Sequence, residues 1–148
     1  MVELASLILP EPPKPAGAYR PAIIVGEMVY LSGFGARDEA GAPLTGRVGA
    51  DIDVAGARQA ARGVGLTMLA VLSETLGDLD RVRQVVRVTG MVQATADFTQ
   101  HPQVIDGCSS LLLDVFGDRG AHARMTYGVQ SLPGGTVLAI DCICQISV

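Results

Sequence analysis

The chain has 148 residues, of which 49% are hydrophobic and only 18% charged, and its formal net charge is -4 at pH 7. This length suits one domain, residues 1–148, that buries a core without disulfides or a metal. The acidic balance and the scattered Lys and Arg residues disfavour a phosphate-binding surface, so we expect no nucleic-acid partner.

Neither a membrane nor an oxidising compartment is indicated. No apolar run approaches the ~18 residues of a membrane span, and Leu4–Leu9 is too short for a signal peptide and lacks a basic leader. The odd number of cysteines (Cys108, Cys142 and Cys144) predicts free, buried thiols. Four metal ligands at usable spacing are missing. We therefore expect a cytoplasmic protein without a metal site.

The N-terminal third predicts an extended segment, a hairpin and a loop. Residues 1–16 are expected to be extended, because the sequence around them is proline-rich. Two short β-type runs, Ile23–Val25 and Met28–Ser32, flank Gly26-Glu27 at the spacing of a tight hairpin. Gly33–Gly49 is rich in Gly, Pro and Asp and predicts a surface loop.

A long helix follows the loop. Asp51 or Asp53 is expected to cap it, apolar residues recur at three-and-four spacing, and Gly77 is its predicted end. Gly63 and Gly65 lie inside the helix, where each costs about 1 kcal/mol relative to Ala. We expect these glycines to allow close packing on a sheet.

The remainder predicts a strand, a second helix and two final strands. Their ranges are Val85–Gln93, a helix from Thr99 or His101 to Gly117, His122–Gln130, and Thr136–Ile146. The resulting order β-β-α-β-α-β-β predicts an α+β protein with one sheet and both helices packed on one face.

The last two strands suggest a site. In the final strand, alternation places Leu138 and its apolar partners toward the helices and Asp141 on the opposite face. In the strand before it, Met125 is assigned to the helix face, leaving Arg124 opposite the helices. If the strands pair, Arg124 and Asp141 share one face. They would form either a salt bridge that holds an oligomer together or an anion pocket, in which a guanidinium binds a carboxylate.

The face opposite the helices has no predicted element to cover it, so another subunit is the expected cover. His122 lies on the same strand as Arg124, and Ser109, Ser110 and Ser131 make a Ser-His-Asp triad conceivable. No nucleophile motif surrounds these serines. A hydrogen-bonded structural histidine is the favoured interpretation.

Several fragments together resemble the RidA (YjgF) family, particularly a longer branch of it, from about Gly17 to Ile146. The fragments are Ala18-Tyr19, Leu31-Ser32-Gly33, Val104-Ile105-Asp106-Gly107-Cys108-Ser109, Val115-Phe116-Gly117, Gly120-Ala121-His122-Ala123-Arg124, Gly128, Leu132-Pro133 and Ala139-Ile140-Asp141. The resemblance implies a chorismate-mutase-like fold, homotrimers and active clefts between subunits. It also implies hydrolysis of reactive enamines and imines, such as 2-aminoacrylate, to 2-oxo acids and ammonia without a cofactor.

Matched positions imply roles for single residues. Arg124 resembles the arginine that binds the substrate carboxylate, and Asp141 falls where the family usually has a glutamate that orients the attacking water. Tyr19 and Ser32 correspond to residues that line the cleft, and Gly33 to the turn beside them.

Two departures from the family pattern favour an alternative. Asp141 is one methylene shorter than glutamate, and Asp106 stands where this branch usually has asparagine, adding a negative charge near the cleft. The alternative is a non-catalytic trimeric module that binds small carboxylate metabolites. The ribonuclease activity attributed to parts of the family fits poorly with an acidic chain.

Overall fold

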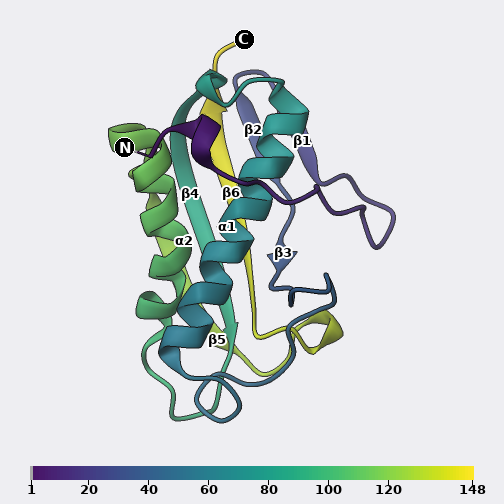
Figure 1. Cartoon of the computed structure of the whole chain (residues 1–148), viewed down its shortest axis with the longest axis vertical. Coiled ribbons are helices and arrows are strands. Elements are labelled where there is room, and N and C mark those ends of the chain that lie inside the picture. Colours follow the sequence, from purple (N-terminus) through teal and green to yellow (C-terminus); the bar gives the residue numbers. More distant parts are fainter. Residues whose placement is uncertain (1) are drawn as a thin grey trace.

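The computed structural model describes residues 2–148. Figure 1 shows two helices lying on the same side of one sheet. In chain order the elements are β1 (Ala22–Val25), β2 (Met28–Leu31), β3 (Phe34–Gly35), α1 (Val54–Leu76), β4 (Val82–Gln93), α2 (His101–Phe116), β5 (Ala123–Val129) and β6 (Leu138–Ile146). The predicted α+β architecture is confirmed, with the short β3 added inside the predicted loop.

Local sequence explains where the elements begin and end. The Asp53 carboxylate accepts a hydrogen bond from the Gly56 backbone N–H at 2.8 Å and caps α1. Gly77 ends the same helix with φ 79°, and Gly26 turns the β1–β2 hairpin with φ 59°. In the segment before the hairpin, a short 3-10 turn at Leu4–Ser6 interrupts the predicted extended chain; residue 1 lies outside the described residues.

The strand order is β1-β2-β6-β4-β5, and β3 also pairs with β6. β4 and β5 are parallel, whereas β6 is antiparallel to β4. The expected pairing of the last two strands is therefore wrong, because β4 lies between them. A parallel pair needs a long crossover connection, and α2 supplies it between β4 and β5.

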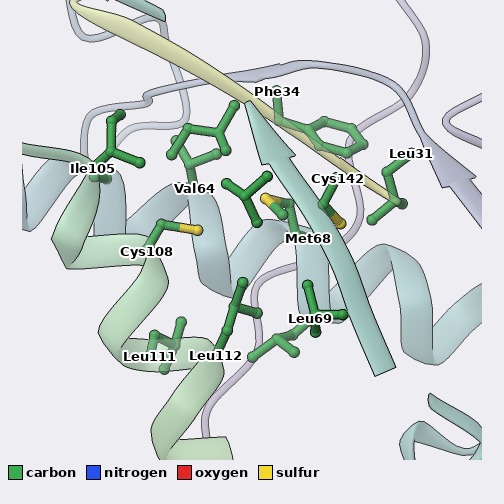
Figure 2. Close-up of a cluster of buried hydrophobic side chains, with 14 of the residues drawn as sticks. Leu31, Phe34, Val64, Met68, Leu69, Ile105, Cys108, Leu111, Leu112 and Cys142 are labelled. Atoms are coloured by element: carbon green, nitrogen blue, oxygen red, sulfur yellow. The ribbon is translucent and has the colours of Figure 1, made fainter. Parts of the chain in front are cut away.

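The core lies between the helices and the sheet. Figure 2 shows Cys108 of α2 beside Val64 and Met68 of α1, close to Cys142 from β6. All three cysteines are free and buried, as predicted. Burial raises the pKa of Cys108 to about 12, so this thiol stays protonated at neutral pH.

Glycines bring the two helices together. A Cβ on Gly107 of α2 would overlap the carbonyl oxygen of Arg58 in α1, so the two backbones meet there. A Cβ on Gly65 would press on Leu111 and Cys108 of α2, whereas a Cβ on Gly63 would meet nothing within 4 Å. The expectation that Gly63 and Gly65 pack on the sheet is wrong, since Gly65 faces the other helix and Gly63 is exposed.

Replacing Gly107 with Ala is expected to lower the free energy of unfolding by about 3 kcal/mol, because the methyl group forces two helix backbones apart. The matched change Gly63→Ala, on an exposed helix position, should be neutral or stabilise by up to about 1 kcal/mol. Urea denaturation of both variants and the unaltered protein measures the contrast. Equal effects at the two positions would contradict the backbone contact.

Candidate functional site

Arg124 lies on β5, the strand at one edge of the sheet. Its Nη1 donates to Asp106 Oδ1 at 2.7 Å and to Ser109 Oγ at 3.1 Å, and both partners belong to α2. The side chain of Arg124 is 24% exposed and that of Asp106 40% exposed. The guanidinium is therefore held against the helix while part of it still reaches the surface.

The two hydrogen bonds use both hydrogens of Nη1 and leave the opposite side of the guanidinium unengaged. Among residues 2–148, no group accepts a hydrogen bond from Nη2 or Nε of Arg124. These two nitrogens form a planar pair of donors that matches the two oxygens of a carboxylate. Arg124 can thus keep Asp106 as its partner and still bind a second carboxylate side-on.

Ser109 also links Arg124 to His122. His122 Nδ1 lies 2.6 Å from the Gly120 carbonyl oxygen, which can only accept, so Nδ1 carries the proton. His122 Nε2 is then the acceptor for the Ser109 hydroxyl, 2.9 Å away. The favoured interpretation of His122 as a hydrogen-bonded histidine agrees with this geometry, in which Ser109 donates to His122 and accepts from Arg124.

Arg124 and Asp141 lie on opposite faces of the sheet. Arg124 pairs in register with Val88, which is fully buried under the helices, whereas Asp141 pairs with Thr89 on the other face. The expectation that the two side chains share one face is wrong. Polar residues of β5 point toward the helices because α2 offers them Asp106 and Ser109, while Met125 faces away and is 52% exposed.

Asp141 lies beside a bulge in the neighbouring strand. Tyr30 of β2 pairs with Ile143 of β6, and Phe34 of β3 pairs with Ile140. The segment from Tyr30 to Phe34 is therefore one residue longer than the segment of β6 that it faces, which defines the bulge. Ser32-Gly33 fills the break between β2 and β3 and lies next to Asp141. Three of the predicted site residues are thus neighbours at this position.

Burial raises the pKa of Asp141 above its ordinary value. The hydroxyl and backbone of Thr89 and the positive charge of Arg87 act in the opposite direction without cancelling this effect. A carboxylate with a raised pKa binds a proton more readily and is a better general base than an exposed one.

Tyr19 and Gly33 both line a cavity of about 340 Å³ at the edge of the sheet. Tyr19 is half exposed, and a Cβ on Gly33 would meet nothing within 4 Å, so the backbone there is open to a ligand. The Ser32 hydroxyl donates to the Arg20 carbonyl oxygen at 2.6 Å and holds the chain next to Tyr19 in place.

The predicted site residues therefore form two groups in one chain. Asp141, Ser32, Gly33 and Tyr19 lie where β2 and β3 meet β6, and Arg124 with Asp106 lies at the β5 edge. The sheet face opposite the helices carries apolar side chains at both ends. Those more than 40% exposed are Ile23, Val25, Tyr30, Met125 and Tyr127.

Within residues 2–148, no group of three or more His, Cys, Asp or Glu side chains is arranged to hold a metal ion. No helix in this range is both long and apolar enough to cross a bilayer.

Comparison with known proteins decides the family. A family model described as "YjgF/chorismate mutase-like, putative endoribonuclease" matches residues 1–146. The chain belongs to this family. The RidA (YjgF) resemblance is confirmed.

The relatives of this YjgF-family chain are similar along nearly their whole length. Protein TCP17 of Trypanosoma cruzi is 34% identical over 140 residues, which cover 94% of this chain and 88% of TCP17. The crystal structure of Atu1372, a protein of unknown function from Agrobacterium tumefaciens, is 37% identical, with a TM-score of 0.87 and coverage of 97% and 89%. A structure described as a putative endoribonuclease from Shewanella oneidensis is 32% identical, with a TM-score of 0.90 and coverage of 96% and 94%.

Sequence reasoning missed the environment of both charged groups. Thr89 and Arg87 influence Asp141 from β4, and Ser109 supports Arg124 from α2. The spacing of Asp106 and Ser109, three apart on one helix, was the available signal that both point the same way. No pattern in the sequence indicated that β4 separates β5 from β6.

The raised pKa of Asp141 predicts a pH-dependent stability difference for Asp141→Asn. The folded state binds this proton more readily than the unfolded chain, so the unaltered protein loses stability as pH rises from about 3.9 through the folded-state pKa. Asparagine carries no charge at any of these pH values. The free energy of unfolding of the variant should therefore rise relative to that of the unaltered protein over this pH window, and the difference should stay constant above it. Urea midpoints at fixed protein concentration between pH 3 and about pH 7 measure the difference.

Thr89→Val gives a matched test of the same assignment. Removing the Thr89 hydroxyl should raise the Asp141 pKa further and shift the window to higher pH. A variant Asp141→Asn that loses stability relative to the unaltered protein as pH rises would contradict the assignment.

Proposed function

We propose that this protein hydrolyses reactive enamines and imines of the 2-aminoacrylate type to 2-oxo acids and ammonia, in a cleft between two copies of the chain. The observation that carries the proposal is the oriented Arg124, which keeps Nη2 and Nε available while Asp106 and Ser109 hold Nη1. Such a guanidinium suits the carboxylate of a small imino acid.

A second copy is needed because the two groups of site residues lie apart in the sheet. β5 is one edge strand, and the β2–β3 break lies on the other side of β6 and β4. Head-to-tail contact places the Arg124 edge of one copy against the Asp141 region of the next, and such contacts close into a ring. A homotrimer also covers the exposed apolar residues Tyr30, Met125 and Tyr127.

The reaction needs little beyond orientation and charge. Arg124 binds the substrate carboxylate, and Tyr19, Ser32 and Gly33 shape the cleft. Asp141 accepts a proton from a water molecule while the oxygen of that water attacks the imine carbon, giving a carbinolamine. The proton then passes to the nitrogen, the C–N bond breaks, and ammonia and a 2-oxo acid are released. An enamine substrate is first converted to the imine by taking up a proton at carbon.

Arg124→Ala is expected to lower kcat/KM for imine hydrolysis about 100-fold or more, because two charge-assisted hydrogen bonds to the carboxylate are lost. The imine is generated in situ from alanine by an amino-acid oxidase, and semicarbazide traps whatever survives. Arg83→Ala, which removes an exposed arginine of β4, is the matched control and should keep full activity. Equal activity of Arg124→Ala and the unaltered protein would contradict the role of Arg124.

Mixing two inactive variants tests whether the cleft is shared. Arg124→Ala and Asp141→Asn chains, unfolded and refolded together in equal amounts, should recover about a quarter of the full activity, because random ring assembly pairs an intact Arg124 with a neighbour's intact Asp141 in that share of clefts. Each variant refolded alone should stay inactive. No recovery in mixed oligomers, confirmed by native mass spectrometry, would contradict a site built from two copies.

The alternative is a trimeric module that binds small carboxylates without turning them over. The specific observation in its favour is Asp141, whose carboxylate is one methylene shorter than that of the usual glutamate and reaches less far toward an attacking water. Saturable binding of 2-oxo acids that Arg124→Ala abolishes, together with unchanged imine trapping in folded oligomer, would establish it.

A further inference from the structure

The cavity of about 340 Å³ beside Gly33 is larger than the reacting atoms of a small imine require. Its volume lies at the lower end of the ~300–1,000 Å³ of ligand pockets. A water molecule occupies ~30 Å³ in the liquid, so the cavity exceeds the needs of a methyl group many times over.

The walls of this cavity are mainly apolar and stiff. Prolines from three separate segments line it, namely Pro15, Pro43 and Pro133, and Phe34 and Ala139 add apolar surface. Proline has no backbone N–H and a fixed φ, so these segments offer few hydrogen bonds and little freedom to collapse. Such walls favour an apolar group over a polar one.

Two residues that line the cavity lie near Asp141, the base of the proposed reaction. Gly33 lines it and lies beside Asp141, and Ala139 is two residues from Asp141 on the same face of β6. Alternate residues of a strand are about 7 Å apart. A substrate whose imine carbon lies at Asp141 can therefore extend its side chain toward Ala139 and the cavity.

The charged residues at the cavity are positive, which suits an anionic imino acid. Lys14 and Arg37 contribute to its lining and both are exposed, while no Asp or Glu among the described residues lines it. The surroundings therefore favour an anionic ligand over a cationic one.

We propose that this cavity binds the substrate side chain and makes the protein selective for imino acids with large apolar side chains. The inference rests on the proposed function, whose reaction centre it extends. Each buried methylene favours binding about fourfold. The imine derived from leucine should therefore have a kcat/KM at least about tenfold above that derived from alanine.

Thr67 of α1 allows the cavity to be filled from the side away from Asp141. Thr67 lines the cavity and its hydroxyl donates to the Gly63 carbonyl oxygen at 3.3 Å. Thr67→Phe should abolish the preference for the leucine-derived imine and leave hydrolysis of the alanine-derived imine within about twofold. Thr67→Ser, which leaves the cavity open, should keep the preference.

Binding gives a second measurement that does not depend on turnover. Isothermal titration with two 2-oxo acids, one with an isobutyl and one with a methyl side chain, should show tighter binding of the larger acid, at least about tenfold. Thr67→Phe should remove that difference in oligomers of unchanged mass and circular dichroism.

The outcomes separate the two proposals. Equal hydrolysis of both imines by the unaltered protein, or a preference that survives Thr67→Phe, overturns the side-chain pocket and leaves the hydrolase standing. Absence of hydrolysis with the binding preference intact overturns the hydrolase and supports the pocket in a binding module. Equal affinity for both 2-oxo acids overturns the pocket in either case.

Discussion

The contact between the backbones of α1 and α2 at Gly107 is the constraint on which the candidate site depends. Any side chain at this position would overlap the carbonyl oxygen of Arg58, so the helices can approach this closely only through glycine. Asp106 precedes Gly107 directly, and Ser109 follows one half-turn later. The same contact that closes the core therefore sets the position of both groups that hold Arg124.

In the isolated chain, Arg124 and Asp141 do not bind each other, so both remain available to a substrate. Arg124 is tethered through one nitrogen only, which orients the guanidinium and leaves two donors for a ligand. Asp141 is kept on the opposite face, away from Arg124, and burial raises its pKa. A guanidinium in direct contact with Asp141 would lower that pKa further than the charge of Arg87 already does, and would weaken Asp141 as a base. Assembly of two copies is what would bring the two groups to one substrate.

The shape of the sheet supports the same view of assembly. β5 is an edge strand whose outward face carries Met125 and Tyr127, and the break between β2 and β3 opens the opposite side at Ser32-Gly33. Exposed apolar surface of this kind is costly in water, and covering it with a second copy removes the cost. In the proposed ring, the surface that binds the neighbour and the surface that binds substrate are therefore continuous.

The sequence by itself determined the order of the main elements, the helix ends at Gly77 and Gly117, and the buried cysteines, and it narrowed the start of α1 to Asp51 or Asp53. These features depend on residues close together in the chain, where caps and periodicity act. It also marked Arg124 and Asp141 as residues of interest, through motifs matched by resemblance.

Only the tertiary structure decided where those residues lie and which groups surround them. The alternation of polar and apolar residues in β5 did not show which face of the strand meets the helices. In this edge strand the polar Arg124 points toward the helices, because Asp106 and Ser109 of α2 are its hydrogen-bond partners. The bulge at Ser32-Gly33 and the insertion of β4 between β5 and β6 depend on pairing between strands far apart in sequence. Local pattern carries no information on such register, because strand pairing is set by packing of the whole sheet.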